Sequence, residues 1–161
     1  MTMALSGSAT VTLPGDTQIL ITRRFAAAPE LVWKAWTTPE LVRRWWHAKR
    51  GEVTVAEVDL RVGGAWRWVM VTPDGFEVGF HGEYHEIDEF SRLVSTEVYE
   101  GMPDAASLNT MTLTPDGDGT LLEILVQHET REHRDGHIAS GMEAGMQDAM
   151  DLLDDVAVGL R

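Results

Sequence analysis

Apolar and polar positions follow distinct patterns in successive parts of the chain. Alternation over residues 17–25 predicts a first strand, and helical spacing predicts two short helices, one beginning at Pro29 and one over residues 40–46. From residue 52 to residue 128 the period is two, and glycine- and proline-containing turns interrupt it. We expect strands over residues 52–60, 65–71, 76–87, 93–99, 107–114 and 120–128.

The end of the chain returns to helical spacing, with apolar residues at intervals of three and four from Ile138 to Leu160. This order predicts an α+β, helix-grip fold: a curved antiparallel sheet of about six to seven strands wrapped around one long C-terminal helix, with two short helices after the first strand. The sheet must bury one face, and its twist lets it curl around the helix. We expect a flexible tail over residues 1–15 and a single domain over residues 16–161.

Composition and charge narrow the classes of partner. Of 161 residues, 26 are Asp or Glu and 13 are Lys or Arg, giving a formal net charge of −13. A surface this acidic repels nucleic-acid phosphates and anionic lipids, so we expect no nucleic-acid or membrane partner. The absence of cysteine excludes disulfides and thiolate chemistry. With no secretion signal and no apolar run long enough to cross a bilayer, we expect a cytoplasmic protein.

A sheet curled around a helix commonly leaves a concave, mostly apolar ligand site. Methionines along the predicted helix offer a flexible, polarizable surface to such a ligand, although plain core packing explains them equally well. The aromatic and methionine side chains expected to line a cavity for a small hydrophobic molecule are Trp33, Trp36, Trp66, Trp68, Met70, Phe80, Tyr84, Tyr99, Met111, Met142 and Met146.

Several segments resemble a known family. They are TRRF at 22–25, APELVWKAWT at 28–37, RWW at 44–46, DLRVGG at 59–64, GEYHEI at 82–87 with RLV at 92–94, and GMEAGM at 141–146. In this order they resemble the SRPBCC (START-like, birch-pollen-allergen-like) superfamily, in the branch homologous to the C-terminal domain of the activator of the heat-shock-protein-90 ATPase. The resemblance spans residues 17–158 and implies the helix-grip fold. A chaperone contact is implied by the name of the family and by no other feature of the resemblance.

The sequence also departs from that family at places that shape a ligand site. Phe90 stands where the family usually has proline, Met146 where many members carry tryptophan, and His47 where glycine commonly follows the Trp-Trp pair. The ligands of relatives therefore do not transfer to this chain.

Motifs for catalysis and metal binding are sparse. There is no Gly-x-Ser-x-Gly and no glycine-rich phosphate loop, and His128 and His133 are five residues apart rather than the four that a zinc-protease helix needs. The pairs His133/His137 and His81/His85 lack an indicated third ligand, so we expect no metal and no cofactor. The basic, aromatic run at 43–50 is interpreted as structural, with the cations at a helix end and the tryptophans packed under the sheet.

Three functional hypotheses remain. The first is a non-catalytic protein that sequesters or carries a small hydrophobic molecule. The second is an enzyme resembling polyketide cyclases or dehydratases, in which a carboxylate such as Glu83, Glu86, Glu97 or Asp59, or a histidine, moves a proton. The third is an interaction module, either a chaperone partner or a homodimer with exposed aromatics.

Overall fold

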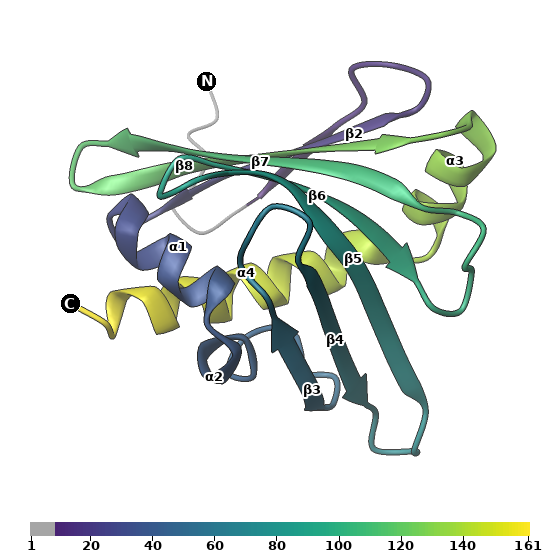
Figure 1. Ribbon diagram of the computed structural model, residues 1–161, viewed down its shortest axis with the longest axis horizontal. Helices are drawn as coiled ribbons and strands as arrows, with labels where there is room; N and C mark the ends of the chain where they lie inside the picture. Colours follow the sequence, from purple (N-terminus) through teal and green to yellow (C-terminus); the bar gives the residue numbers. More distant parts are fainter. Residues whose placement is uncertain (1–8) are drawn as a thin grey trace.

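Alternating side chains build a single antiparallel sheet of eight strands in the computed structural model, which describes residues 9–161 (Figure 1). The strands are β1 (Thr10–Thr12), β2 (Gln18–Phe25), β3 (Glu52–Val58), β4 (Ala65–Val71), β5 (Glu77–Asp88), β6 (Arg92–Tyr99), β7 (Ser107–Asp116) and β8 (Gly119–His128). The helices are α1 (Pro29–Thr37), α2 (Pro39–Val42), α3 (Arg131–Ala139) and α4 (Met142–Val158).

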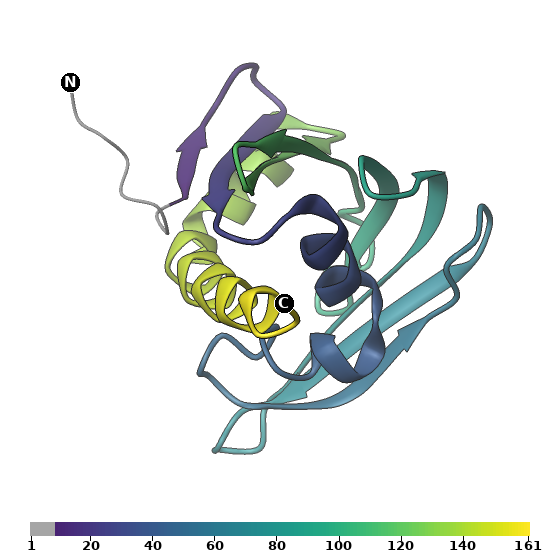
Figure 2. The ribbon, with the colours of Figure 1, turned by 90° about the vertical axis from the view of Figure 1, so that its left-hand side faces the viewer.

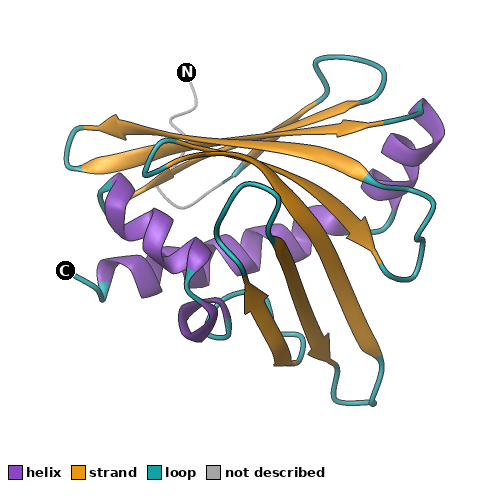
Figure 3. Ribbon diagram, in the orientation of Figure 1, coloured by secondary structure: helices purple, strands orange, loops and turns teal. Residues whose placement is uncertain are grey.

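The sheet order is β1-β2-β8-β7-β6-β5-β4-β3, so β2 returns to lie beside the last strand. The two helices α1 and α2 connect β2, the second strand in this order, to β3 at the far edge of the sheet. The sheet curls strongly, and its concave side holds α1, α2 and α4, as the view along α4 in Figure 2 and the colouring of Figure 3 show. This concave side is called the inner face below.

The sequence prediction needs two corrections. The sheet has eight strands rather than six to seven, because Thr10–Thr12 pairs with Leu20–Thr22 at the edge of β2. β1 lies within the expected tail over residues 1–15, and residues 1–8 of that tail lie outside the described residues. Three residues carry too little alternation to signal a strand, so sequence reasoning missed β1.

The expected single C-terminal helix is two helices. Gly141 separates α3 from α4 with a φ of 80° in the left-handed region, which glycine adopts without the steric cost of a Cβ. At the start of α3 the Thr130 hydroxyl accepts a hydrogen bond from the His133 backbone N–H at 3.0 Å, a regular N-terminal cap. No helix within the described part of the chain is both long and apolar enough to cross a membrane.

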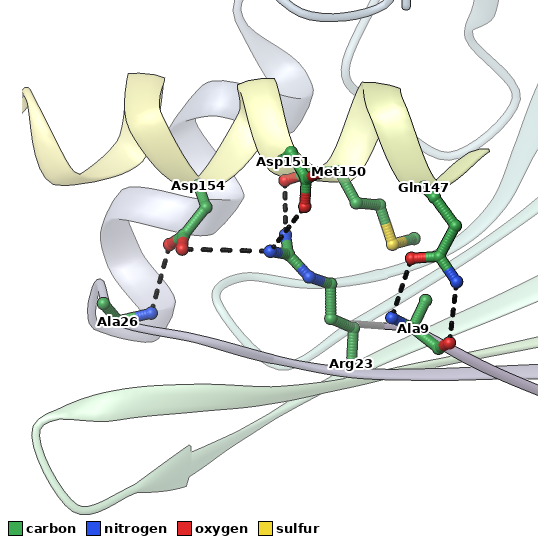
Figure 4. A network of polar contacts seen from close by, with 7 residues as sticks. All are labelled: Ala9, Arg23, Ala26, Gln147, Met150, Asp151 and Asp154. Atoms are coloured by element: carbon green, nitrogen blue, oxygen red, sulfur yellow. Dashed lines mark hydrogen bonds and ion pairs between the residues drawn. The ribbon is translucent and has the colours of Figure 1, made fainter. Parts of the chain in front are cut away.

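A buried arginine on β2 holds the middle of α4 over the sheet (Figure 4). The Arg23 guanidinium, 3% exposed, donates to the backbone carbonyl of Met150 and to Asp151 Oδ1 at 3.1 Å. Asp154 lies 4.0 Å from the same guanidinium, and the cation stacks on the Phe25 ring at 4.6 Å. Burial lowers the pKa of Arg23, while the neighbouring aspartates act in the opposite direction.

Three further contacts fix α4 along its length. The Gln147 side chain both accepts from the Ala9 N–H at 2.9 Å and donates to the Ala9 carbonyl at 2.8 Å, which ties the helix to the residue before β1 (Figure 4). On its other side, Arg50 Nη1 donates to Asp148 at 2.8 Å. The position of α4 is therefore set by polar contacts at its flanks, leaving its apolar face free to pack toward the sheet.

Candidate functional site

The inner face of the sheet has a sealed half and an accessible half. On β2 and β8, side chains such as Ile19, Leu122 and Ile124 pack with Leu153 of α4, and none is more than 7% exposed. On β4 to β7, the inner face carries buried side chains such as Trp68, Tyr84 and Met111 and, beside them, side chains that keep partial exposure. This second set, called the accessible half, consists of Met70, Phe80, Ser95, Glu97, Tyr99 and Asn109.

Aromatic rings cover one end of the accessible half. Their centroids lie 4.9 to 5.8 Å apart in the pairs Trp36–Trp45, Trp45–Trp68, Trp46–Trp68, Trp66–Trp68, Trp46–Phe80 and Phe80–Tyr99. We call these seven residues the aromatic wall. Edge-to-face and tilted pairs of this kind add to the stability of apolar packing.

Two indole N–H groups in the aromatic wall have no hydrogen-bond acceptor among the residues that the structure describes. Trp45 Nε1 donates to the Ala35 carbonyl at 2.9 Å, as a buried indole normally does. Trp66 and Trp68 are 6% and 7% exposed, yet Nε1 of each is unpaired. A buried donor without a partner loses about 1–3 kcal/mol of hydration free energy. A ligand oxygen that accepted a hydrogen bond from either indole N–H would recover part of that loss.

Polar side chains occupy the other end of the inner face. Glu97 on β6 faces Ser107 on β7, which faces His128 on β8, and Asn109 follows Ser107 on the same side of β7. The Ser107 hydroxyl donates to Asn109 Oδ1 at 3.0 Å, and the Asn109 side chain, next to Glu97 on the neighbouring strand, acts to lower the pKa of Glu97. Burial raises the pKa of Glu97, and this outweighs the hydrogen bond from Asn109, which lowers it.

A histidine pair joins β8 to α3 beside these residues. His128 Nε2 lies 3.0 Å from His137 Nδ1, and the two rings meet edge to face with centroids 5.1 Å apart. Burial is the main cause that lowers the pKa of His128 to about 4, and electrostatic interaction with the neighbouring His137, His133 and Arg134 lowers it further. Burial also lowers the pKa of His137, so both rings are neutral near pH 7. We call Glu97, Ser107, Asn109, His128 and His137 the polar cluster.

The predicted cavity residues fall into two groups by exposure. Trp33, Trp66, Trp68, Tyr84 and Met111 are buried in the core. Trp36, Met70, Phe80, Tyr99, Met142 and Met146 are partly exposed. Trp33 lies apart from the aromatic wall, with its ring 6.4 Å from that of Phe90. Ligand contact by any of these residues stays a prediction.

Sequence reasoning singled out Glu97 and the His133/His137 pair but missed Ser107, Asn109 and His128 as members of one cluster. A signal was present in the alternation. Along β7 the inner-face positions run from polar Ser107 and Asn109 to apolar Met111 and Leu113, so one end of the strand breaks the hydrophobic pattern. Only the strand register, however, brings the polar end of β7 against Glu97.

Other candidate motifs have structural partners. His137 turns to His128 instead of forming a metal pair with His133, and within residues 9–161 no three His, Cys, Asp or Glu side chains are grouped to hold a metal ion. His81 pairs with Glu100 at 2.9 Å, beside the Arg67 guanidinium. In the basic run, Arg43 donates to the Val53 carbonyl at 3.0 Å, in keeping with a structural role.

Comparison with known proteins gives one consistent result. A protein from Rhodobacter sphaeroides of known structure is 30% identical over 94% of this chain and 99% of its own, with a TM-score of 0.88. A Nitrosomonas europaea protein is 25% identical over 92% of this chain and 98% of its own, with a TM-score of 0.82. An AHSA1-like protein from Aeromonas hydrophila, 24% identical over 88% and 95% of the two chains, has a TM-score of 0.69 and shares the fold.

No curated protein matches the chain, so none supplies a function for it. The family model described as activator of Hsp90 ATPase homolog 1-like protein matches residues 26–157, most of the chain, including α1, the sheet from β3 to β8 and nearly all of α4. The chain belongs to the activator of Hsp90 ATPase homolog 1-like family.

Proposed function

We propose that the protein binds a small, mainly apolar molecule against the accessible half of the inner face, beneath the first turns of α4, without changing it chemically. The observation that carries this proposal is the aromatic wall with its unpaired Trp66 and Trp68 indole N–H groups. Apolar rings supply the free energy of burial, and a few polar groups orient the ligand, which is the usual composition of small-molecule sites.

The start of α4 also supports the proposal. A Cβ added at Gly145 would meet no atom within 4 Å, and Met142 and Met146 on the same turns are partly exposed. Unbranched methionine side chains adapt to guests of different shape. In contrast, Leu153 and Val156 in the second half of α4 are buried in the sealed core. The helix is thus closely packed at one end and loosely packed at the other.

Binding of N-phenyl-1-naphthylamine, an uncharged fluorescent probe, tests the proposal. Its emission should rise on addition of protein and saturate, and the Met146→Trp variant should weaken binding about tenfold or more, because an indole takes up space at the loosely packed end of α4. Met102→Trp is the matched control, since Met102 is 54% exposed in the loop after β6. No emission change with wild-type protein, or equal loss in both variants, would contradict the proposal.

A further inference from the structure

One row across the inner face connects the aromatic wall to the polar cluster. Trp66 on β4 faces Gly82 on β5, and the register of β5 with β6 continues that line to Glu97. Glu97 faces Ser107, and Ser107 faces His128. At about 4.8 Å between neighbouring strands, the four steps from Trp66 to His128 cover roughly 19 Å. We call these five residues the recognition row.

Gly82 lets the Trp66 side chain lie along the recognition row. A Cβ at Gly82 would stand 2.7 Å from Trp66 Nε1 and 1.9 Å from the Thr96 carbonyl oxygen, so any other residue would push the indole away. With glycine there, the unpaired Trp66 indole nitrogen lies directly over β5, and β5 is the neighbour of β6, the strand that carries Glu97. Glycine inside β5 is therefore explained by the close approach of the Trp66 indole at this position.

Three groups on the recognition row have hydrogen-bonding capacity left over. Trp66 Nε1–H has no acceptor and His128 Nδ1 has no partner within the described residues, although both side chains are more than nine-tenths buried. Asn109 is the one neighbour that acts on the pKa of the Glu97 carboxyl by hydrogen bonding, and a single amide can satisfy only part of the hydrogen-bonding capacity of a carboxyl group. The recognition row contains no lysine or arginine that would balance a carboxylate charge.

The surroundings of the row favour uncharged forms of both acids and bases. Burial raises the pKa of Glu97 toward its neutral acid form, and burial lowers the pKa values of His128 and His137 toward their neutral imidazoles. Opposite shifts in groups of opposite charge type have one common cause, the loss of water around them. A charged ligand group would meet the same cost.

We propose that the recognition row selects an uncharged aromatic molecule that carries hydroxyl or carbonyl oxygens. The inference rests on the proposed function, because it assigns the ligand chemistry of the same site. The ligand ring packs on the aromatic wall, and its oxygen accepts a hydrogen bond from Trp66 Nε1–H. Glu97 donates to or accepts from a second oxygen, and His128 Nδ1 pairs with a group at the far end of the row. Apolar lipids lack these oxygens, and fatty acids bring a charge that the row cannot balance.

Displacement of N-phenyl-1-naphthylamine by a matched series at pH 7 tests this chemistry. The series is naphthalene, 2-naphthol, 2-naphthoate and 2-naphthylmethylamine, which share one ring system and differ in polarity and charge. We expect 2-naphthol to bind about five- to tenfold more tightly than naphthalene, the gain from one additional buried hydrogen bond, and both charged probes to bind more weakly than 2-naphthol. This comparison uses the wild-type protein and needs no variant.

Variants then assign the preference to the row. Glu97→Gln keeps a neutral donor and acceptor of the same shape and should keep the preference for 2-naphthol, whereas Glu97→Leu should abolish most of it. Glu83→Leu, on the exposed outer face of the neighbouring strand, is the matched control and should leave it intact. Equal binding of naphthalene and 2-naphthol, or an unchanged preference in Glu97→Leu, overturns the row while the proposed function stands.

Two other outcomes point elsewhere. Tighter binding of 2-naphthylmethylamine than of 2-naphthol overturns the inference in favour of an organic-cation site, in which Glu97 is a charged carboxylate. Failure of every member of the series, together with failure of N-phenyl-1-naphthylamine itself, overturns the proposed function and the inference together.

Discussion

Replacement of Arg23 by alanine tests how α4 is held over the sheet. The hydrogen bond from the buried guanidinium to the Met150 carbonyl should contribute about 1.5–3 kcal/mol, as bonds to charged groups do. The Asp151 carboxylate is half exposed, so its ion pair adds less than about 1 kcal/mol. Stacking on Phe25 contributes about 0.5–1 kcal/mol.

Part of this gain is offset, because burying the guanidinium costs hydration; the lowered pKa of Arg23 has the same cause. We therefore expect Arg23→Ala to lower the free energy of unfolding by about 3 kcal/mol, a large share of the 5–15 kcal/mol typical of a domain. Urea unfolding followed by far-ultraviolet circular dichroism measures this, and an unchanged slope of free energy against urea concentration shows that the variant differs in stability alone.

Arg24→Ala is the matched control for this experiment. Arg24 is the next residue on β2, but its side chain points to the outer face and pairs with Asp116 at the surface. Its removal should cost less than about 1 kcal/mol. If Arg23→Ala costs no more than Arg24→Ala, the buried contacts to Met150 and Asp151 do not hold α4, and the reasoning is refuted.

Further predictions concern the helix, the sheet and the ionisable groups. Gly145→Ala should raise the free energy of unfolding by about 0.5–1 kcal/mol, because alanine favours a helix and an added Cβ meets no atom there. Gly82→Ala should lower the free energy of unfolding by more than about 2 kcal/mol, because the added Cβ clashes with Thr96. Urea unfolding of both variants measures the two effects, and effects of the same sign would contradict this prediction. Between pH 6.5 and about 4, His128 is protonated in the unfolded chain but stays neutral in the folded protein, so the free energy of unfolding should fall as the pH falls, by at most about 1.4 kcal/mol per pH unit. His128→Leu should flatten this pH dependence. An equal slope in both proteins would be evidence against a neutral His128. The Glu100 carboxyl, hydrogen-bonded by a guanidinium and an imidazole, should show a pKa of about 2 by NMR titration, and an ordinary value near 4.5 would rule out those bonds in solution.

The fold was largely predictable because most strands alternate over seven or more residues. Strands such as Ala65–Val71 and Gly119–His128 lie where alternation places them, and α1 begins at Pro29, whose fixed φ suits the first helical turn. The break at Gly141 was not predicted, since apolar spacing of three and four continues across it. One left-handed residue redirects the chain without disturbing the hydrophobic pattern.

The site was less predictable than the fold. Composition pointed to tryptophan and methionine, and Trp66, Trp68 and Met111 do lie on the inner face, but the polar cluster depends on which residues of separate strands come to face each other. Glu97 and His128 are 31 positions apart, and only the pairing of β6, β7 and β8 sets Ser107 between them. A shift of one residue in either pairing would turn a member of the cluster to the outer face.

The short strand β1 decides how the sheet ends. At the other edge, β3 carries exposed Glu52 and Glu57 and a register irregularity between Val53 and Val55, features that discourage a second chain from pairing there. Beside β2 that protection is the three residues of β1 alone. Deleting residues 1–15 as a dispensable tail would leave the backbone of β2, which carries Ile19, Ile21 and Thr22, open to pairing with another copy. The start point of an expressed chain would then determine whether the protein stays dispersed or forms intermolecular sheets.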